Sequence, residues 1–315
     1  MSLTKLFEKG KTAFSFEILP PLKGNSIDAV YRIVDKLIEF DPRCINITTH
    51  HSEYLYRDLP DGTIQKYNIR KRPGSVAIAA ALQYKYKVMA IPHMICKGFT
   101  REETEYALID LDFLGVQNLL LLRGDADRLE SSQMGGDRNN YALDLQEQVN
   151  NFNQGLALGG FTFTAPTTPF SYGMACYPEV HEEAPNMESD IRYMKMKQDA
   201  GAEYFITQMF FDNQKYFSFV EKCRQAGVTV PIIPGLKPIG SMRHLTLLPK
   251  TFRASIPESL EIELRKCKSD DETKEVGVEW AIAQSRELME FGVPSLHFYT
   301  LMATESVRRI AKEIY

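Results

Sequence analysis

The chain has 315 residues, of which 44% are hydrophobic and 25% are charged, and its formal net charge is −4. This length allows a large buried core and fits one α/β barrel with extensions. The negative charge balance leaves no basic surface for nucleic acid, and the apolar stretch at 76–82 is far too short to span a membrane.

The cysteines and the amino terminus indicate the compartment. Residues 1–11 lack the apolar core of a secretory signal. The five cysteines are scattered, odd in number and without a C-x-x-C pair. This pattern predicts reduced thiols in a cytoplasmic protein and argues against a disulfide framework or a zinc site. No H-E-x-x-H or comparable pair occurs either, so we expect no metal centre.

Eight short apolar runs end in polar or turn-forming residues. The clearest is 119–122, four leucines that lead directly into Arg123, Gly124 and Asp125. A continuous apolar run is typical of a strand buried on both faces, and parallel α/β folds build their active sites where such strands end. In chain order the predicted strands are 14–17, 44–47, 88–92, 119–122, 172–176, 204–207, 230–233 and 296–298.

Helix-length patterns lie between most of these runs. Thr100 and Glu103 form a capping-box signature at the start of one of them. A glycine that precedes the next strand follows four of the patterns, where glycine suits the left-handed position that ends a helix; these are Gly115, Gly201, Gly227 and Gly292. The predicted helices are 26–40, 76–86, 100–114, 142–154, 187–200, 213–226 and 271–291.

Strands that alternate with helices predict an α/β fold, specifically a (βα)₈ TIM barrel that forms a single domain over residues 1–315. An open doubly wound sheet is the competing fold, but no G-x-G-x-x-G follows the first strand. The polar segments 53–73 and 125–140 are expected to form long loops at strand ends. Residues 155–169 look irregular, and we assign them no function.

Glu17 is the sharpest single candidate for chemistry. It lies between Phe16 and Ile18 in the first strand, so its side chain would reach the mouth of a barrel. Burial without a cationic partner raises the pKa of a carboxyl group, which suits a general acid near neutral pH. A structural carboxylate paired with Arg or Lys is an equally good interpretation.

Other polar residues occupy the remaining strand ends. Asp125 follows Gly124, whose small size lets a ligand approach, although a turn or N-cap aspartate would look the same. His93 and His181 lie near strand ends, where histidines commonly bond to backbone. The amide of Gln208 could match a heterocycle edge or be a satisfied core group. We find no nucleophile elbow and no lysine at an obvious strand end, which suggests that a cofactor carries the chemistry.

Seven motifs cover the chain from Phe14 to about Leu301: Phe14-Ser15-Phe16-Glu17-Ile18-Leu19-Pro20-Pro21, Leu122-Arg123-Gly124-Asp125, Tyr177-Pro178-Glu179-Val180-His181, Asp199-Ala200-Gly201-Ala202, Ile206-Thr207-Gln208 with Phe210-Phe211-Asp212, Ile233-Pro234-Gly235 and His297-Phe298-Tyr299-Thr300-Leu301. In this order they resemble the methylenetetrahydrofolate reductase family. The resemblance implies a (βα)₈ barrel that holds FAD. The chain looks like the catalytic barrel without the regulatory domain of eukaryotic members.

The resemblance also implies a two-stage reaction. NADH or NADPH reduces FAD and leaves, and 5,10-methylenetetrahydrofolate then receives the hydride to give 5-methyltetrahydrofolate, a methyl source for methionine synthesis. Glu17 matches the glutamate that assists opening of the methylene bridge to an iminium cation, which a nearby carboxylate would stabilise. Asp125 matches the aspartate near the flavin and the pterin. Gln208 matches the amide that holds the folate, and Tyr299 lies on the substrate side.

By motif position, the resemblance implies that FAD contacts Thr48, His93, Leu122, Arg123, Gly124, Asp125, Tyr141, Ala142, Tyr177, His181, Asp190 and Lys197. Arg123, His181 and Lys197 would help to neutralise the pyrophosphate. The chain departs from the family pattern at Thr49-His50-His51, where a Tyr-Gly-Ala segment is common, at Met242, where an aromatic residue often stands, and at Ala303, where arginine is common. These departures bear on flavin contacts near the second strand, nicotinamide stacking and folate-tail binding.

Two rival classes remain open. A folate-binding methyltransferase barrel would need no flavin, and an inactive barrel could serve as an interaction module, although Glu17 and Asp125 argue against the latter. We expect small-molecule substrates, no nucleic-acid or membrane partner, and a homo-oligomer. The choice between NADH and NADPH is left open, because the chain has no Rossmann ribose-binding acid to interpret.

Overall fold

The computed structural model describes residues 3–7, 10–124, 137–301 and 303–315. Its main sheet has the strand order β10-β11-β1-β2-β5-β6-β7-β8-β9, and the pairs with a defined register are parallel. The order begins at β10 and ends at β9, two strands that only Pro234 separates. The fold is therefore a nearly closed α/β barrel of the TIM type, as predicted.

The strands of the barrel sheet are β1 (Ala13–Ile18), β2 (Cys44–Ile47), β5 (Met89–Ile95), β6 (Asn118–Leu122), β7 (Ser171–Cys176), β8 (Tyr204–Thr207), β9 (Ile232–Ile233), β10 (Gly235–Leu236) and β11 (Ser295–Tyr299). The α-helices are α1 (Asp28–Val34), α2 (Ser75–Tyr86), α3 (Arg101–Phe113), α4 (Ala142–Asn153), α5 (Met187–Asp199), α6 (Asn213–Gln225), α7 (His244–Phe252), α8 (Glu258–Lys266), α9 (Asp270–Phe291) and α10 (Thr304–Ile314). Short 3₁₀ helices cover Leu3–Leu6, Ile38–Phe40 and Leu158–Gly160.

The chain divides into two compact units. The first contains Met1–Ile18, Ile33–Asn46 and Ser171–Tyr315, and the second contains Leu19–Arg32 and Ile47–Phe170. A single domain over the whole chain stays a prediction.

Two predicted elements are broken in the structure. The helical pattern at 26–40 forms α1 only to Val34, after which Leu37 N–H donates to the Val34 carbonyl and the chain tightens into a 3₁₀ turn. Within the apolar run at 230–233 only Ile232–Ile233 forms a strand, β9, and a second short strand, β10 (Gly235–Leu236), follows after the end of the run. Pro234 lies between them and has no N–H to donate to a neighbouring strand, which explains the interruption.

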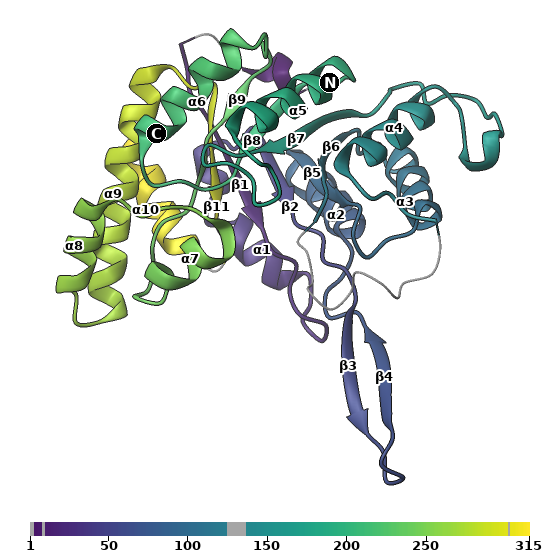
Figure 1. Cartoon of the computed structure of the whole chain (residues 1–315), viewed down its shortest axis with the longest axis horizontal. Coiled ribbons are helices and arrows are strands. Elements are labelled where there is room, and N and C mark those ends of the chain that lie inside the picture. The colour runs from purple at the N-terminus through teal and green to yellow at the C-terminus, as the bar shows by residue number, and fades with distance from the viewer. Residues whose placement is uncertain (1–2, 8–9, 125–136, 302) are drawn as a thin grey trace. The chain divides into compact units, whose positions relative to one another are not determined.

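The expectation of a long loop at 53–73 was wrong. Strands β3 (Glu53–Asp58) and β4 (Ile64–Ile69) pair antiparallel in a separate hairpin of the second unit, drawn as two long arrows in Figure 1. Tyr54, Leu55 and Tyr56 favour extended structure, and the turn is fixed by hydrogen bonds from Thr63 to Asp61. The loop had been predicted from the polar composition of the segment, which does not exclude a hairpin.

Helix ends follow the sequence closely. Thr100 and Glu103 form the predicted capping box of α3, with Glu103 N–H 3.0 Å from Thr100 Oγ1. All four marker glycines have positive φ, from 67° at Gly115 to 111° at Gly201. This conformation is accessible to glycine at little cost, so each helix can stop and turn into the next strand.

The two faces of β1 have different surroundings. The rings of Phe14 and Phe16 lie 5.7 Å apart, and Phe14 also contacts Phe40, Phe298 and Tyr315. Because successive side chains of a strand point to opposite faces, Ser15 and Glu17 lie on the other face of β1. This alternation separates the aromatic packing of the first unit from its polar site.

Candidate active site

Glu17 and Tyr299 are neighbours on adjacent parallel strands of the first unit. The register of β1 and β11 pairs Glu17 with Tyr299 and Ser15 with His297. Only 7% of Glu17 is exposed. Burial raises the pKa of the Glu17 carboxyl from 4.5 to about 8, and the Lys237 ammonium opposes this rise. Glu17 therefore holds its proton near neutral pH, as a general acid requires.

Tyr299 connects this pair to the end of β8. Its hydroxyl donates to the carbonyl oxygen of Thr207 at 2.6 Å. Gly235 makes this placement possible, because a Cβ there would lie 2.3 Å from the Thr207 carbonyl oxygen and 2.6 Å from Cε2 of Tyr299. Burial, followed by the nearby Glu17 charge, raises the pKa of the Tyr299 hydroxyl well above its ordinary value. Tyr299 therefore remains a neutral hydrogen-bonding group.

Gln208 follows directly after Thr207. Its backbone N–H donates to the Cys176 carbonyl, and its side-chain oxygen Oε1 accepts from Met209 N–H at 2.9 Å. This bond orients the amide and uses one of its acceptor positions. Glu17, Tyr299 and Gln208, predicted from separate motifs, thus occur on connected strand ends of one unit.

His297 and Ser15 form the layer next to this site. Ser15 Oγ lies 3.0 Å from His297 Nδ1, and no partner of the imidazole Nε2 is found among the described residues. Burial lowers the pKa of His297 from 6.5 to about 3, so the ring is neutral. The neutral His297 ring can hold Ser15 in place, but it adds no positive charge near Glu17.

Lys237 is the residue that sequence reasoning missed. The expectation that no lysine occupies a strand end was wrong, because β10 ends at Leu236 and Lys237 comes next. The apolar run had been ended at Ile233, since Pro234 and Gly235 are common turn formers. If the predicted strand had been continued past Pro234, Lys237 would have been placed at its end, beside the site.

The predicted flavin contacts of the first unit cluster after β7. The Tyr177 and His181 rings lie 4.5 Å apart, and His181 N–H donates to Asp190 Oδ2 at 2.6 Å. Lys197 on α5 donates to the Ala175 carbonyl at 3.5 Å. Burial lowers the pKa of Lys197, while Cys176 and Asp190 act in the opposite direction. These four predicted residues occur together.

A second group of predicted contacts follows β6 in the second unit. The Arg123 guanidinium lies over the Tyr141 ring, 5.1 Å from its centroid, and its Nε donates to the Asn140 carbonyl at 3.2 Å. Asp144 at the start of α4 accepts from the backbone N–H groups of both Asn140 and Tyr141 at 2.9 Å. These bonds fix the chain that leads into Ala142. Gly124 has φ 87°, which favours glycine there.

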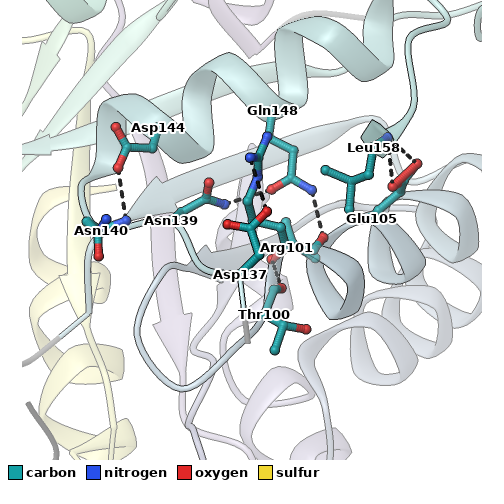
Figure 2. Close-up of polar contacts among 10 residues, drawn as sticks. Thr100, Arg101, Glu105, Asp137, Asn139, Asn140, Asp144, Gln148 and Leu158 are labelled. Carbon is teal, nitrogen blue, oxygen red and sulfur yellow. Dashed lines mark hydrogen bonds and ion pairs between the residues drawn. The ribbon is translucent and has the colours of Figure 1, made fainter. Parts of the chain in front are cut away.

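Polar contacts hold this chain segment against α3 and α4 (Figure 2). Arg101 donates from its backbone N–H to the Asp137 carbonyl at 2.9 Å and from its side chain to the Asp137 carboxylate at 3.3 Å. Asn139 donates to Gln148 Oε1, and Gln148 donates in turn to the Arg101 carbonyl, both at 2.7 Å. Sequence reasoning treated 125–140 as one loop, yet its last residues are tied firmly to two helices.

The remaining predicted flavin contacts of the second unit lie in strands or directly after them. His93 is buried and pairs with Leu120 in the β5–β6 register, while Leu122 ends β6. Thr48 follows β2 and lies 3.3 Å from His50 Nε2 through its hydroxyl. The departure Thr49-His50-His51 is also structured, because Thr49 Oγ1 donates to the His93 carbonyl at 2.5 Å.

Asp125 lies outside the described residues. Met242 packs, partly buried, against an apolar cluster that also contacts Tyr299. Ala303 precedes α10 and makes no side-chain capping bond. In the described part of the chain, no three His, Cys, Asp or Glu side chains converge on a possible metal position. The described helices likewise include none that is long and apolar enough to cross a bilayer.

Comparisons with known proteins cover the whole chain. A family model described as methylenetetrahydrofolate reductase matches residues 2–315. The "Probable methylenetetrahydrofolate reductase (NADPH)" of Caenorhabditis elegans is 29% identical over 99% of this chain and 43% of its own length. The "Methylenetetrahydrofolate reductase (NADH) 1" of Arabidopsis thaliana is 30% identical over 95% of this chain and 48% of its own. The chain thus spans less than half of each of these relatives.

A solved structure shows the same fold. It is an uncharacterized protein from Clostridium thermocellum, described as binding two copies of 5-methyl-5,6,7,8-tetrahydrofolic acid. The alignment covers 96% of this chain and 95% of that protein, with a TM-score of 0.57 and 19% sequence identity. At this identity the likeness supports the barrel architecture alone.

Proposed function

Because the chain belongs to the methylenetetrahydrofolate reductase family, we propose that it reduces 5,10-methylenetetrahydrofolate to 5-methyltetrahydrofolate with electrons from NADH or NADPH. The two relatives named above differ in the nicotinamide that their names give, so either donor is consistent. The observation that carries the proposal is Glu17, a buried carboxyl protonated near neutral pH, paired across strands with Tyr299. Such a group suits a reaction that must protonate its substrate.

Glu17 would donate its proton to a nitrogen of the methylene bridge. The carboxylate left behind would then stabilise the iminium cation that forms when the bridge opens. Tyr299, held by the Thr207 carbonyl, forms part of the adjoining wall, and the amide nitrogen of Gln208 is available to bond the pterin. These roles agree with the neutral states of Glu17 and Tyr299 in the structure.

We also propose FAD as the cofactor. A bound flavin would supply the transfer of two electrons from NAD(P)H to the folate. The donor set of the first unit fits its pyrophosphate, since His181 after β7 and Lys197 on α5 are cationic or potentially cationic groups that are held by hydrogen bonds. Gly124 presents no side chain beside Arg123, which would let a ligand approach the backbone.

The proposal also covers the cellular location of the enzyme, its oligomeric state and the use of its product. All five cysteines are free thiols, which supports a cytoplasmic location. A homo-oligomer and a role for the product in methionine synthesis remain predictions from the family resemblance.

The decisive experiment compares the wild-type chain with Glu17→Gln. We expect both proteins to be yellow, with an oxidised-flavin spectrum that NADH or NADPH bleaches under anaerobic conditions. Methylenetetrahydrofolate should restore the colour rapidly in the wild type and about 10²–10⁴-fold more slowly in the variant, the usual contribution of a general acid. Reduction of the flavin should be unaffected, because it needs no proton from Glu17.

The rivals give different outcomes. A colourless protein that binds 5-methyltetrahydrofolate would favour the flavin-free methyltransferase barrel. A colourless protein without folate affinity would favour an inactive module. A yellow Glu17→Gln protein with undiminished folate reduction would remove Glu17 from the mechanism. Glu179→Gln is a matched control, because Glu179 is held by Lys215 and Ser255 and is predicted to be structural.

A further inference from the structure

Lys237 lies at the same level of the sheet as Glu17. The β10–β11 register pairs Gly235 with His297 and Leu236 with Phe298, and the β1–β11 register continues from Phe298–Phe16 to Tyr299–Glu17. Parallel registers advance one residue at a time, so the residue after Leu236 falls level with Tyr299. Glu17 on β1 and Lys237, the residue directly after β10, therefore lie on either side of Tyr299 on β11.

The Lys237 ammonium is half-buried and, among the described residues, makes no side-chain hydrogen bond or ion pair. Its charge acts on Glu17 from a distance. Burial lowers the pKa of Lys237, and Glu17 opposes this change, just as Lys237 lowers the pKa of Glu17 against the larger effect of burial. Each of the two charges therefore shifts the pKa of the other group.

The other titratable and charged groups around the pair come from several elements. Tyr299 on β11 faces Glu17, and Cys176 and Tyr177 at the end of β7 face Tyr299. His244 on α7 faces Lys237, and Asp270 on α9 and the neighbouring Arg243 also act on His244. Burial and the Lys237 charge both lower the pKa of His244, so it adds no positive charge near neutral pH. Lys237 is thus a cation of this unit whose charge lowers the pKa of Glu17.

We propose that Lys237 is a positioning residue for proton donation: its ammonium, held level with Glu17 across Tyr299, is the counter-charge to the carboxylate that Glu17 becomes when it acts as an acid. This inference rests on the proposed function and names a device within the same site. In the donating step the O–H bond of Glu17 breaks, the proton passes to a bridge nitrogen of the folate, and the electron pair stays on the carboxylate. The ammonium of Lys237 stabilises that charge.

The physical consequence is a stronger acid at the moment of reaction. A buried carboxyl without a counter-charge would hold its proton too tightly, since transfer would leave an unpaired anion in an apolar setting. A cation in direct contact would have the opposite effect and leave Glu17 ionised before the substrate arrives. The separation of Lys237 by one strand is a compromise between these two extremes.

The test follows the Glu17 carboxyl directly. Infrared difference spectra of the purified full chain between pH 5 and pH 10 would show the protonated C=O band, assigned by its loss in Glu17→Gln. In Lys237→Met we expect the titration midpoint to rise by about one pH unit, the scale of a charge pair near a protein surface. Lys237→Arg should stay close to the wild type, and Lys237→Gln serves as a second neutral variant.

A functional readout accompanies the titration. The alkaline limb of the pH profile for folate reduction should move upward in Lys237→Met, with kcat reduced by about three- to tenfold. NAD(P)H oxidation with an artificial acceptor should keep its wild-type profile. Lys250→Met is the matched control, because Lys250 is an exposed lysine on α7 and should change neither readout.

The outcomes separate this inference from the proposed function. An unchanged Glu17 midpoint in both neutral variants would overturn the role of Lys237, whatever the activity. A Lys237→Arg protein that behaves like Lys237→Met would do the same, because the charge would then be irrelevant. If Lys237→Met shifts the Glu17 midpoint but the wild-type protein does not reduce methylenetetrahydrofolate, the effect of the Lys237 charge would be supported and the proposed function would be overturned.

Discussion

Two glutamates near strand ends show how surroundings decide the chemistry of a carboxyl group. Glu179 forms an ion pair with Lys215 and accepts from the backbone and the hydroxyl of Ser255. Through these contacts the Glu179 carboxylate links three segments of the chain. Glu17 is more deeply buried, and the cation that acts on it stands one strand away. Glu17 can therefore exchange a proton, while Glu179 has a structural role.

At the same scale, Gln208 can be tested as a substrate-binding residue. Gln208→Ala should raise KM for methylenetetrahydrofolate, because an unsatisfied partner on the pterin costs about 1–3 kcal/mol. NAD(P)H oxidation with an artificial acceptor should change little. Steady-state kinetics of the two reactions on one preparation measure the difference.

Gln198→Ala is the control for this prediction. Gln198 accepts from the backbone N–H groups of Thr229 and Val230, away from Gln208, so its loss should lower the melting temperature without selecting between substrates. Equal loss of both reactions in Gln208→Ala would contradict a folate-binding role. Such a result would instead mark the amide as structural, through its bond to Met209.

At the scale of elements, the short strand β10 determines the geometry of the site. Gly235 lies where the Tyr299 ring and the Thr207 carbonyl approach closely, and Pro234 separates β10 from β9. The strand is only two residues long, yet it sets the register that brings Lys237 level with Glu17. A local interruption of the sheet thus creates part of the site.

Gly235→Ala should displace Tyr299. Its methyl group would lie 2.3 Å from a backbone oxygen, which cannot move as a flexible side chain can, so we expect a loss of about 1–3 kcal/mol in the free energy of unfolding. Folate reduction should fall as well, because Tyr299 borders Glu17. Chemical denaturation and kinetics would measure both effects.

Gly240→Ala provides the comparison, because a Cβ at Gly240 meets its nearest atoms at 3.9 Å and no positive φ is involved. That variant should retain wild-type stability and activity. If Gly235→Ala matched it in both measurements, the close packing of Tyr299 over β10 would not be needed for the site.

At the scale of the whole molecule, buried titratable groups make stability depend on pH. Folded Glu17 keeps its proton to about pH 8, whereas the unfolded chain releases it near 4.5. Folding therefore binds a proton in this range, and the stabilising contribution present below pH 4.5 is lost as the pH rises through 8. His297 acts on the acid side: its pKa falls from 6.5 to about 3, so its contribution is lost as the pH falls through this interval.

Glu17→Gln should remove only the alkaline effect. The difference in unfolding free energy between variant and wild type should grow in favour of the variant between pH 5 and pH 9, by up to about 1.4 kcal/mol for each unit of pKa shift. Urea unfolding at several pH values measures this difference. The acid limb, to which His297 contributes, should be the same in both proteins. A difference that does not vary with pH would contradict the raised pKa of Glu17.

Most of the elements could be predicted from the amino-acid sequence, and the candidate residues were chosen from it. Seven of the eight predicted apolar runs form strands over most of their length and the run at 230–233 does so over its last two residues, because continuous apolar side chains are typical of strands buried on both faces. Helix ends at Thr100 and at the marker glycines were equally predictable, since capping and positive φ are properties of a few neighbouring residues. Glu17, Gln208 and Tyr299 followed from motifs, and the structure links their strands. Asp125 stays a prediction.

The contacts that these residues make depend on the folded chain. The hairpin at 53–69 and the strand after Pro234 were missed, because a polar or turn-forming composition does not reveal pairing with a distant partner. The Tyr299–Thr207 bond joins residues 92 positions apart, and Lys237 acts on Glu17 across 220 positions in the chain. Such contacts depend on strand register, and so do the burial and charge that set the proton affinity of Glu17. The strands that form these contacts are parallel and are joined by long connections, so no short stretch of the sequence shows their register.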